Sequence, residues 1–302
     1  MIHFALDYTF YKILIGTSLI GITTGILGCF TLLNRQSLLG DTIAHATLPG
    51  LTGMFLIVLH QSYVLLLCGA GISGLLGALC VHLITSNSSL KKDAALGIIL
   101  STFFGVGIIF LTMIQKLPDA HQAGIDKFLF GQAATLLYHD IYILSIIAII
   151  VIMTVIYLWK ELTIISFDQA YAQSIGMPVN TITIILTILI VLTIIVGLQT
   201  VGLILISSFL IAPALAARQW TSSLTKTVML SIFFSLIATT TGTFISCIAP
   251  HIPTGPTIVI ISTTITLLSI LTSPTGLILQ RFFPRQNNLK ICATAKDNNL
   301  CH

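Results

Sequence analysis

Asp41 and His45 are the two residues of this chain whose types and spacing are best suited to binding a metal ion. They stand four positions apart in the stretch Asn34–Gly50, which joins one apolar segment to the next. Residues i and i+4 lie on one face of a helix, so the carboxylate and the imidazole would point the same way. Both groups are ligands of divalent cations such as Zn²⁺, whose usual shell has four ligands. The spacing therefore indicates half of a metal site.

A simpler arrangement of the same two residues also fits the sequence. Asp41 would cap a helix that begins near Thr42, and His45 would pack beside it. The residues alone leave both arrangements open. Ionisable residues in membrane segments are generally functional, however, so the surroundings of the pair matter.

The composition is that of an integral membrane protein. Only 7% of the 302 residues are charged, 56% are apolar, and the mean hydropathy is +1.05. A soluble domain carries roughly 25% charged residues. The basic residues are scattered singly, so the net charge of +4 does not indicate a nucleic-acid partner. No CxxC pair occurs, which leaves neither a redox motif nor a thiolate zinc site.

Apolar segments near the length needed to cross a bilayer, about 20 residues, recur along the chain. They are read as helices because an open strand in lipid leaves backbone groups unpaired. The sequence predicts an all-α, polytopic bundle of eight or nine spans. Their approximate ranges are Tyr11–Leu33, Ala44–His60, Ser62–Thr85, Ala94–Gln115, Tyr138–Trp159, Thr181–Gln199, Gly202–Ala217, Thr225–Ala249 and Thr257–Leu279.

The distribution of lysine and arginine predicts how these spans are oriented, because cytoplasmic loops carry an excess of both. With nine spans and the amino end outside, ten basic residues fall inside and three fall outside. This predicts a transmembrane domain over residues 1–280 and a polar cytoplasmic tail over residues 281–302. The inner residues are Arg35, Lys91, Lys92, Lys160, Arg218, Lys226, Arg281, Arg285, Lys290 and Lys296, and the outer ones are Lys12, Lys116 and Lys127.

A polar stretch between the fifth and sixth predicted spans is too short to cross the membrane. Ser166 and Gln169 have the spacing of a capping box, and Asp168 falls in the first turn, where the helix dipole favours a negative charge. Gly176 suits a helix end and Pro178 prevents continuation. The pattern predicts a cytoplasmic helix of about ten residues, at roughly 166–177. It fits either a linker or a docking helix for a cytoplasmic partner.

Three blocks of sequence together resemble the permease subunits of bacterial ATP-binding-cassette importers for zinc, manganese and iron, the ABC-3 family. The first is Asn34–Gly50, with its Gly-Asp, His-Ala and Leu-Pro-Gly elements. The second is Phe167–Ala170 with Ala172 and Gly176. The third comprises Gly197, Gly202, Ser207–Ala217 and Pro253–Pro256. The resemblance covers about residues 10–280 in the expected order, and the first block is its most specific part.

The resemblance implies a transport subunit with the fold of a type II importer permease, bound in a homo- or heterodimer in the bacterial inner membrane. It implies separate cytoplasmic ATPase subunits and an extracytoplasmic solute receptor that delivers the metal. Asp41 and His45 would line the ion pathway, and a dimer would bring together two copies of each. No cofactor would be bound permanently. The residues expected to couple the permease to the ATPase are Phe167, Asp168, Gln169, Ala170, Ala172 and Gly176.

Other functions are less compatible with the sequence. The chain has no GxxxxGK[ST] motif, so ATP hydrolysis is expected in another subunit and not here. A permease for siderophores or corrinoids would share the short cytoplasmic helix but would not need Asp41 and His45. An ion-coupled secondary transporter would need carboxylates in the middle of spans, whereas the nine acidic residues fall at predicted loops or span ends.

Overall fold

Helices are the only regular secondary structure in the residues that the computed structural model describes, which are 8–58, 63–116, 131, 138–248 and 252–273. Most of these segments are apolar on every side, and a helix satisfies its own backbone hydrogen bonds in lipid. The predicted all-α class is confirmed. The helices are α1 (Tyr8–Leu33), α2 (Leu39–Val58), α3 (Tyr63–Asn87), α4 (Lys92–Ile114), α6 (Tyr138–Tyr157), α7 (Trp159–Phe167), α8 (Gln169–Ser174), α9 (Val179–Thr200), α10 (Leu203–Arg218), α11 (Leu224–Ile248) and α12 (Thr254–Thr272).

Eight of the described helices are long and apolar enough to cross a membrane, and α10 is a shorter apolar helix. Its 16 residues measure about 24 Å at 1.5 Å per residue, less than the roughly 30 Å of a hydrocarbon core. Only Val201 and Gly202 separate it from α9, and Gly202 has a φ of +94°, which glycine adopts without strain. The two helices therefore form a tight hairpin, and the prediction of eight or nine spans holds, with α10 as the short one.

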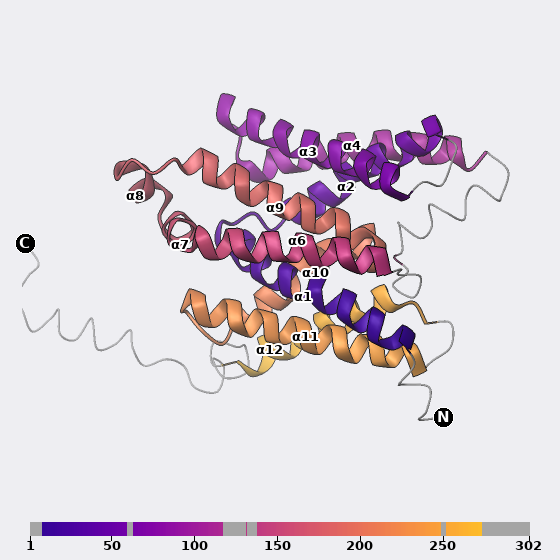
Figure 1. The fold of residues 1–302 in the computed structure, drawn as a ribbon. Coiled ribbons are helices and arrows are strands. Elements are labelled where there is room, and N and C mark those ends of the chain that lie inside the picture. The colour runs from indigo at the N-terminus through magenta and orange to yellow at the C-terminus, as the bar shows by residue number, and fades with distance from the viewer. Residues whose placement is uncertain (1–7, 59–62, 117–130, 132–137, 249–251, 274–302) are drawn as a thin grey trace, which may run out of the picture.

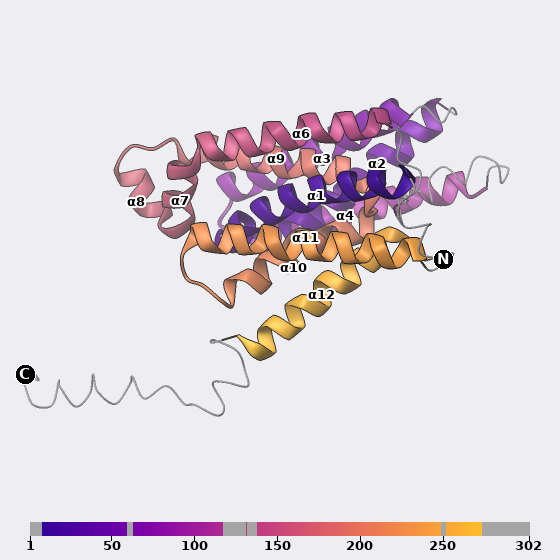
Figure 2. The ribbon, with the colours of Figure 1, turned by 60° about the horizontal axis from the view of Figure 1, so that its bottom comes forward.

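The long helices lie side by side, and successive ones run in opposite directions (Figures 1 and 2). One group contains α2, α3 and α4, and a second contains α10, α11 and α12. Helix α1 packs mainly on α11 and α10 and also contacts α6 and α9, while α2 contacts α10 and so joins the two groups. The site described below lies where these two groups meet.

Small residues allow close contacts between the helices. Gly21 and Gly25 of α1 face α11, where the Ser235 hydroxyl donates to the Gly21 carbonyl at 2.6 Å and the Ser231 hydroxyl donates to the Gly25 carbonyl at 2.9 Å. A side chain at either glycine would meet α11 directly. The glycines thus bring two spans close enough for hydroxyl groups to bond across them.

Six of the eight described basic residues belong to the end of the bundle that carries α7 and α8, an end that Figure 1 shows. Most of them lie in or beside a connection at that end. These residues are Arg35, Lys91, Lys92, Lys160, Arg218 and Lys226. Lys12 and Lys116 lie toward the opposite end, while Lys127 and the predicted tail lie outside the described residues.

Candidate functional site

Asp41 and His45 face each other on α2, as their spacing predicts. The His45 Nε2 atom lies 3.4 Å from the Asp41 Oδ1 atom, and the two side chains are 18% and 38% exposed, respectively. Two ligands of one tetrahedral ion, each bound at about 2.1 Å, lie about 3.4 Å apart. The spacing of the pair therefore suits two ligands of a single divalent ion with little rearrangement.

The helix begins earlier than the sequence predicts, and this changes the role of Asp41. Helix α2 starts at Leu39 rather than near Ala44, so Asp41 lies inside its first turn. Its Oδ1 atom accepts a hydrogen bond from the Ser207 hydroxyl of α10 at 3.2 Å. The alternative in which Asp41 caps a helix beginning near Thr42 is therefore wrong, since Asp41 is already helical and binds side chains.

Ser207 is a member of the site that the sequence alone does not single out. It is buried, and it lies 166 positions from Asp41 in the chain. Its hydrogen bond orients the carboxylate from a second helix, as partners of metal ligands commonly do. The available signal was its position at the start of the Ser207–Ala217 block, but only the fold shows which residue it contacts.

His45 is held from a different side. The Phe104 ring of α4 meets the imidazole edge to face, with centroids 4.8 Å apart. The Nδ1 atom of His45 is buried and has no hydrogen-bond partner among the described residues. Pro49 lies four positions later within α2, so its nitrogen cannot donate to the His45 carbonyl. His45 thus has a ring nitrogen, Nδ1, without a hydrogen-bond partner among the described residues, and a backbone carbonyl that lacks the usual N–H donor from position i+4.

The pair lies deep in the bundle even though it is close to the start of α2. Ser207 lies eleven positions before Arg218 in α10, which is about 16 Å along the helix. Phe104 lies about 18 Å from the start of α4 by the same measure, close to the middle of that helix. Helix α2 therefore begins within the bundle, and its first turn lies beside interior turns of α4 and α10 and not beside their ends.

The described residues do not complete a metal shell around the pair. No group of three or more His, Cys, Asp or Glu side chains suited to a metal ion occurs among them. The hydroxyl of Thr42, the neighbour of Asp41, donates to the Leu38 carbonyl at 2.9 Å and lies 3.4 Å from the Leu96 carbonyl of α4, so it is directed to backbone. Among the described residues, Asp41 and His45 thus form a pair of possible side-chain ligands without a third His, Cys, Asp or Glu beside them.

A short polar helix lies where the sequence predicts one, but it starts later and is shorter than expected. Ser166 belongs to α7, so the capping-box prediction is wrong, and α8 has six residues, 169–174. Asp168 is the true N-cap, and its carboxylate accepts a hydrogen bond from the Tyr171 backbone N–H at 2.9 Å. Asp168 has extended backbone between α7 and α8, which is the conformation of an N-cap and breaks one helix into two.

The end of α8 follows the prediction for Gly176. This residue has a φ of +77°, the conformation that closes a Schellman motif. Its N–H bonds to the Gln173 carbonyl at 3.0 Å, and the Met177 N–H bonds to the Ala172 carbonyl at 3.1 Å. The Asp168 cap and Gly176 together stabilise α8, whose six residues would be too few for a stable helix in an isolated peptide.

The predicted coupling residues do not share one surface. Phe167, Asp168, Gln169, Ala170 and Gly176 are exposed, whereas Ala172 is fully buried. Figure 1 shows α8 standing out from one end of the bundle. Ala172 therefore anchors α8 to the rest of the chain, and the other five are available to a partner.

Comparison with known proteins relates this arrangement to transport permeases. Residues 7–273 match the family described as the ABC 3 transport family. The manganese transport system membrane protein MntC of Bacillus subtilis (strain 168) is 40% identical over 299 residues, covering 96% of this chain and 69% of MntC. The zinc transport system membrane protein TroC of Treponema pallidum (strain Nichols) is 39% identical over 280 residues, covering 93% of this chain and 94% of TroC.

A solved structure shows the same fold. The match is to a chain of the complex titled PsaBC from Streptococcus pneumoniae in complex with Fab, with a TM-score of 0.79 and 31% identity. It covers 93% of the present chain and all of the solved one. The similarity therefore extends over the whole bundle and includes the helices that carry Asp41, His45 and Ser207.

Proposed function

The chain belongs to the ABC 3 transport family, and we propose that it is the membrane-spanning permease subunit of an ATP-driven importer of divalent transition-metal ions. The relatives MntC and TroC are named for manganese and zinc transport, which makes Mn²⁺ and Zn²⁺ the first candidates. The ion would be the cargo and not a resident cofactor. Mixed oxygen and nitrogen ligands suit both ions, so ligand type does not choose between them.

The observation that carries this proposal is the Asp41–His45 pair held by Ser207 inside the bundle. A charged side chain at this depth is costly unless it has a role or a partner. The pair supplies two side-chain ligands, so two copies meeting at a shared axis would supply four. We infer that the functional permease is a dimer, formed with a second copy or a close homologue.

The proposal assigns ATP hydrolysis to separate subunits that dock on α8. The exposed Phe167, Asp168, Gln169 and Ala170 form the contact surface, and Ala172 transmits its movement to the bundle. The basic residues at the same end favour a cytoplasmic location for it. An extracytoplasmic receptor would deliver the ion to the opposite end. Residues 1–280 would be the permease domain, and residues 281–302 a cytoplasmic tail.

Metal uptake by the assembled transporter tests the role of the pair. Proteoliposomes containing the permease, its ATPase and its receptor would be supplied with radioactive Mn²⁺ or Zn²⁺. Asp41→Asn and His45→Gln preserve size and are expected to lower uptake at least about tenfold, since each removes one of few ligands. Asp93→Asn and His139→Gln change exposed residues of the same types and are the matched controls.

Two results would overturn the proposal. Full metal uptake by Asp41→Asn and His45→Gln would remove the pair from the ion pathway. Uptake of a metal–siderophore complex in place of the free ion would assign the chain to the larger-cargo permeases instead.

A further inference from the structure

Two cavities meet in the groove between α3 and α9, at the end of the bundle that bears α8. One, the polar cavity, is lined by polar as well as apolar side chains and has a volume of about 170 Å³, and the other is apolar and has a volume of about 350 Å³. They share the lining residues Ala78, His82, Thr183 and Thr187. The groove is therefore continuous and changes from apolar to polar toward the α8 end.

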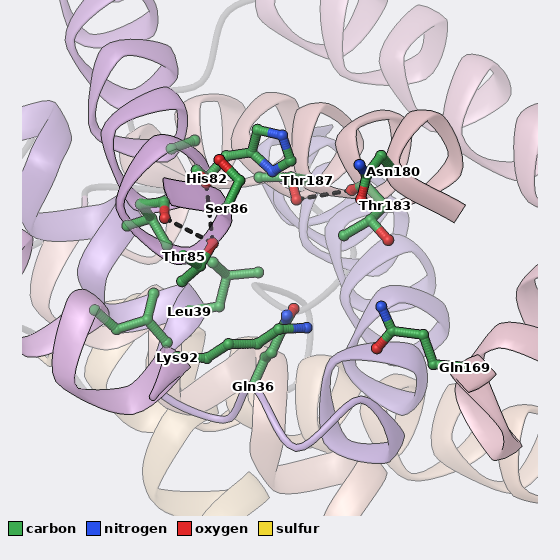
Figure 3. Close-up of a pocket in the computed structure, with 13 residues that line it drawn as sticks. Gln36, Leu39, His82, Thr85, Ser86, Lys92, Gln169, Asn180, Thr183 and Thr187 are labelled. Carbon is green, nitrogen blue, oxygen red and sulfur yellow. Dashed lines mark hydrogen bonds between the residues drawn. The ribbon is translucent and has the colours of Figure 1, made fainter. Parts of the chain in front are cut away.

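The polar cavity is rich in hydrogen-bond donors. Figure 3 shows the side-chain ends of Gln36, Lys92 and Gln169 turned toward a common space, with His82 and Asn180 along another side of it. Lys92 is exposed and makes no ion pair with any described carboxylate. None of the described residues that line the cavity is acidic. The space thus favours an anion that accepts several hydrogen bonds.

The hydroxyl groups around this cavity are already committed as donors. Thr85 donates to the carbonyls of Val81 and His82 at 2.9 and 3.0 Å, and Thr187 donates to the Thr183 carbonyl at 2.9 Å (Figure 3). Such bonds to the preceding turn leave a threonine oxygen as an acceptor only. The donors left for a ligand are therefore the Lys92 ammonium, the amides of Gln36, Gln169 and Asn180, and the His82 imidazole N–H.

The apolar cavity continues the groove toward the middle of the bundle. Its lining includes the branched side chains of six exposed residues, Ile72, Leu75, Leu76, Leu79, Ile184 and Ile188. The apolar part of the groove suits an acyl chain, and the cationic, amide-lined end suits an anionic headgroup, so the groove matches the two parts of a lipid. A free inorganic anion would fill the polar end and leave the apolar part unused.

We propose that this groove binds an anionic phospholipid of the cytoplasmic leaflet. The phosphate would lie among Lys92, Gln36 and Gln169, and an acyl chain would follow Leu79 and Ile184 along α3 and α9. Basic pockets between membrane helices on the cytoplasmic side are known sites for such headgroups. The lipid would bridge α8, through Gln169, to the turn before α2, through Gln36, and so connect the docking helix to the site of Asp41.

The proposal rests on the membrane orientation in the proposed function but not on metal transport. Its test uses the full-length chain purified in mild detergent and exchanged into nanodiscs of phosphatidylglycerol mixed with phosphatidylcholine. Native mass spectrometry after release from the nanodisc counts the phosphatidylglycerol molecules that remain bound. The unaltered chain is expected to retain phosphatidylglycerol in preference to phosphatidylcholine.

Paired variants locate the site. Lys92→Gln is expected to lower phosphatidylglycerol retention about fivefold, as for the loss of one cation near a lipid surface. Lys91→Gln, the exposed neighbour that does not line the cavity, should leave retention unchanged. Leu79→Trp fills the apolar slot and should also lower retention, whereas Leu83→Trp, one turn away on α3 and outside both cavities, should not.

Three outcomes would overturn the proposal. Equal retention in all four variants would show that the groove is not the site. Equal retention of phosphatidylglycerol and phosphatidylcholine would remove the charge selectivity. Displacement of the bound lipid by inorganic phosphate alone would show that the polar cavity takes a free anion. Because no readout needs metal or an ATPase, these failures would leave the proposed function untouched.

Discussion

The Asp41 carboxylate is held from two helices at once, and this is what makes it suitable for binding a cation. His45 approaches it from the next turn of α2, and Ser207 approaches it from α10. Both contacts go to the Oδ1 atom, so the carboxylate is oriented before any ion arrives. A ligand that is already oriented loses less conformational freedom on binding.

Replacing Ser207 should weaken ion binding without abolishing it. Ser207→Ala removes the hydrogen bond that orients Asp41 but leaves both proposed ligands in place. The loss of such an orienting partner typically costs about 10- to 100-fold in metal affinity. We expect the KM for metal uptake to rise by about this factor while the maximal rate falls less.

Ser208→Ala is the matched control for that measurement, because Ser208 is the exposed neighbour on the same helix. An unchanged KM in Ser207→Ala would mean that the hydrogen bond has no part in holding the ion.

At the residue scale the sequence predicts the pair but not its setting. The four-residue spacing is a local property, so a helix is sufficient to bring Asp41 and His45 together. Ser207 and Phe104 come from other helices, and their contacts depend on how α4 and α10 pack against α2. No local pattern carries that information, which is why Ser207 emerges only from the fold.

Helix α2 depends on a close crossing with α3. A Cβ atom at Gly50 would lie 2.1 Å from the Gly69 carbonyl oxygen, so the two backbones could not keep their present separation. Gly50→Ala should therefore destabilise the bundle by about 1–3 kcal/mol, the usual cost of overpacking. The thermal midpoint of the detergent-solubilised protein, followed by size-exclusion chromatography after heating, would report it.

Gly53→Ala is the control on the same helix, because a Cβ atom there would meet only the Phe110 ring at an ordinary 3.4 Å. Equal midpoints for the two variants would contradict the close crossing.

Helix α8 should depend on its cap. Asp168→Ala removes the acceptor for the Tyr171 N–H, and the loss of an N-cap costs about 1 kcal/mol. This lowers the population of a marginal helix roughly fivefold. ATP hydrolysis by the assembled complex, measured at saturating metal and receptor, should fall accordingly.

Asp168→Asn retains an N-cap acceptor and should restore most of the ATP hydrolysis. A loss of equal size in both variants would assign the effect to the charge of Asp168 and not to the cap. Normal hydrolysis in Asp168→Ala would argue against α8 as the docking element.

At the element scale the sequence predicts the long helices well because continuous apolarity over about 20 residues has few alternatives in lipid. It fails at short polar elements, where single residues decide the boundaries. Ser166 and Asp168 are both good N-caps, and the choice between them depends on whether α7 continues through Ser166. The tertiary contacts of α7, with Leu162 and Ile165 in the core, favour that continuation.

The orientation of the whole molecule in the membrane can be measured directly. In a background from which the six cysteines have been replaced, Lys116→Cys should react with a membrane-impermeant maleimide in intact cells. Ser88→Cys and Ser174→Cys, at the opposite end, should react only after permeabilisation. The expectation follows from the gathering of basic residues at the α8 end. The reverse pattern of labelling would invert the proposed orientation.

Completion of the proposed metal site depends on the whole assembly and not on one helix. The sequence predicts two ligands, and the described residues add no third His, Cys, Asp or Glu. A dimer axis cannot be read from one chain, since symmetry between copies leaves no pattern in the sequence. The fold contributes the depth of the pair, which a prediction from span boundaries places too near the membrane surface.

Pulsed electron paramagnetic resonance of Mn²⁺ bound to the purified permease tests most directly whether two Asp41–His45 pairs hold the transported ion. We expect one tightly coupled Mn²⁺ for every two copies, with nitrogen couplings from imidazole that disappear in His45→Gln. Nitrogen couplings that persist in His45→Gln, or one such ion for every copy, would contradict this expectation.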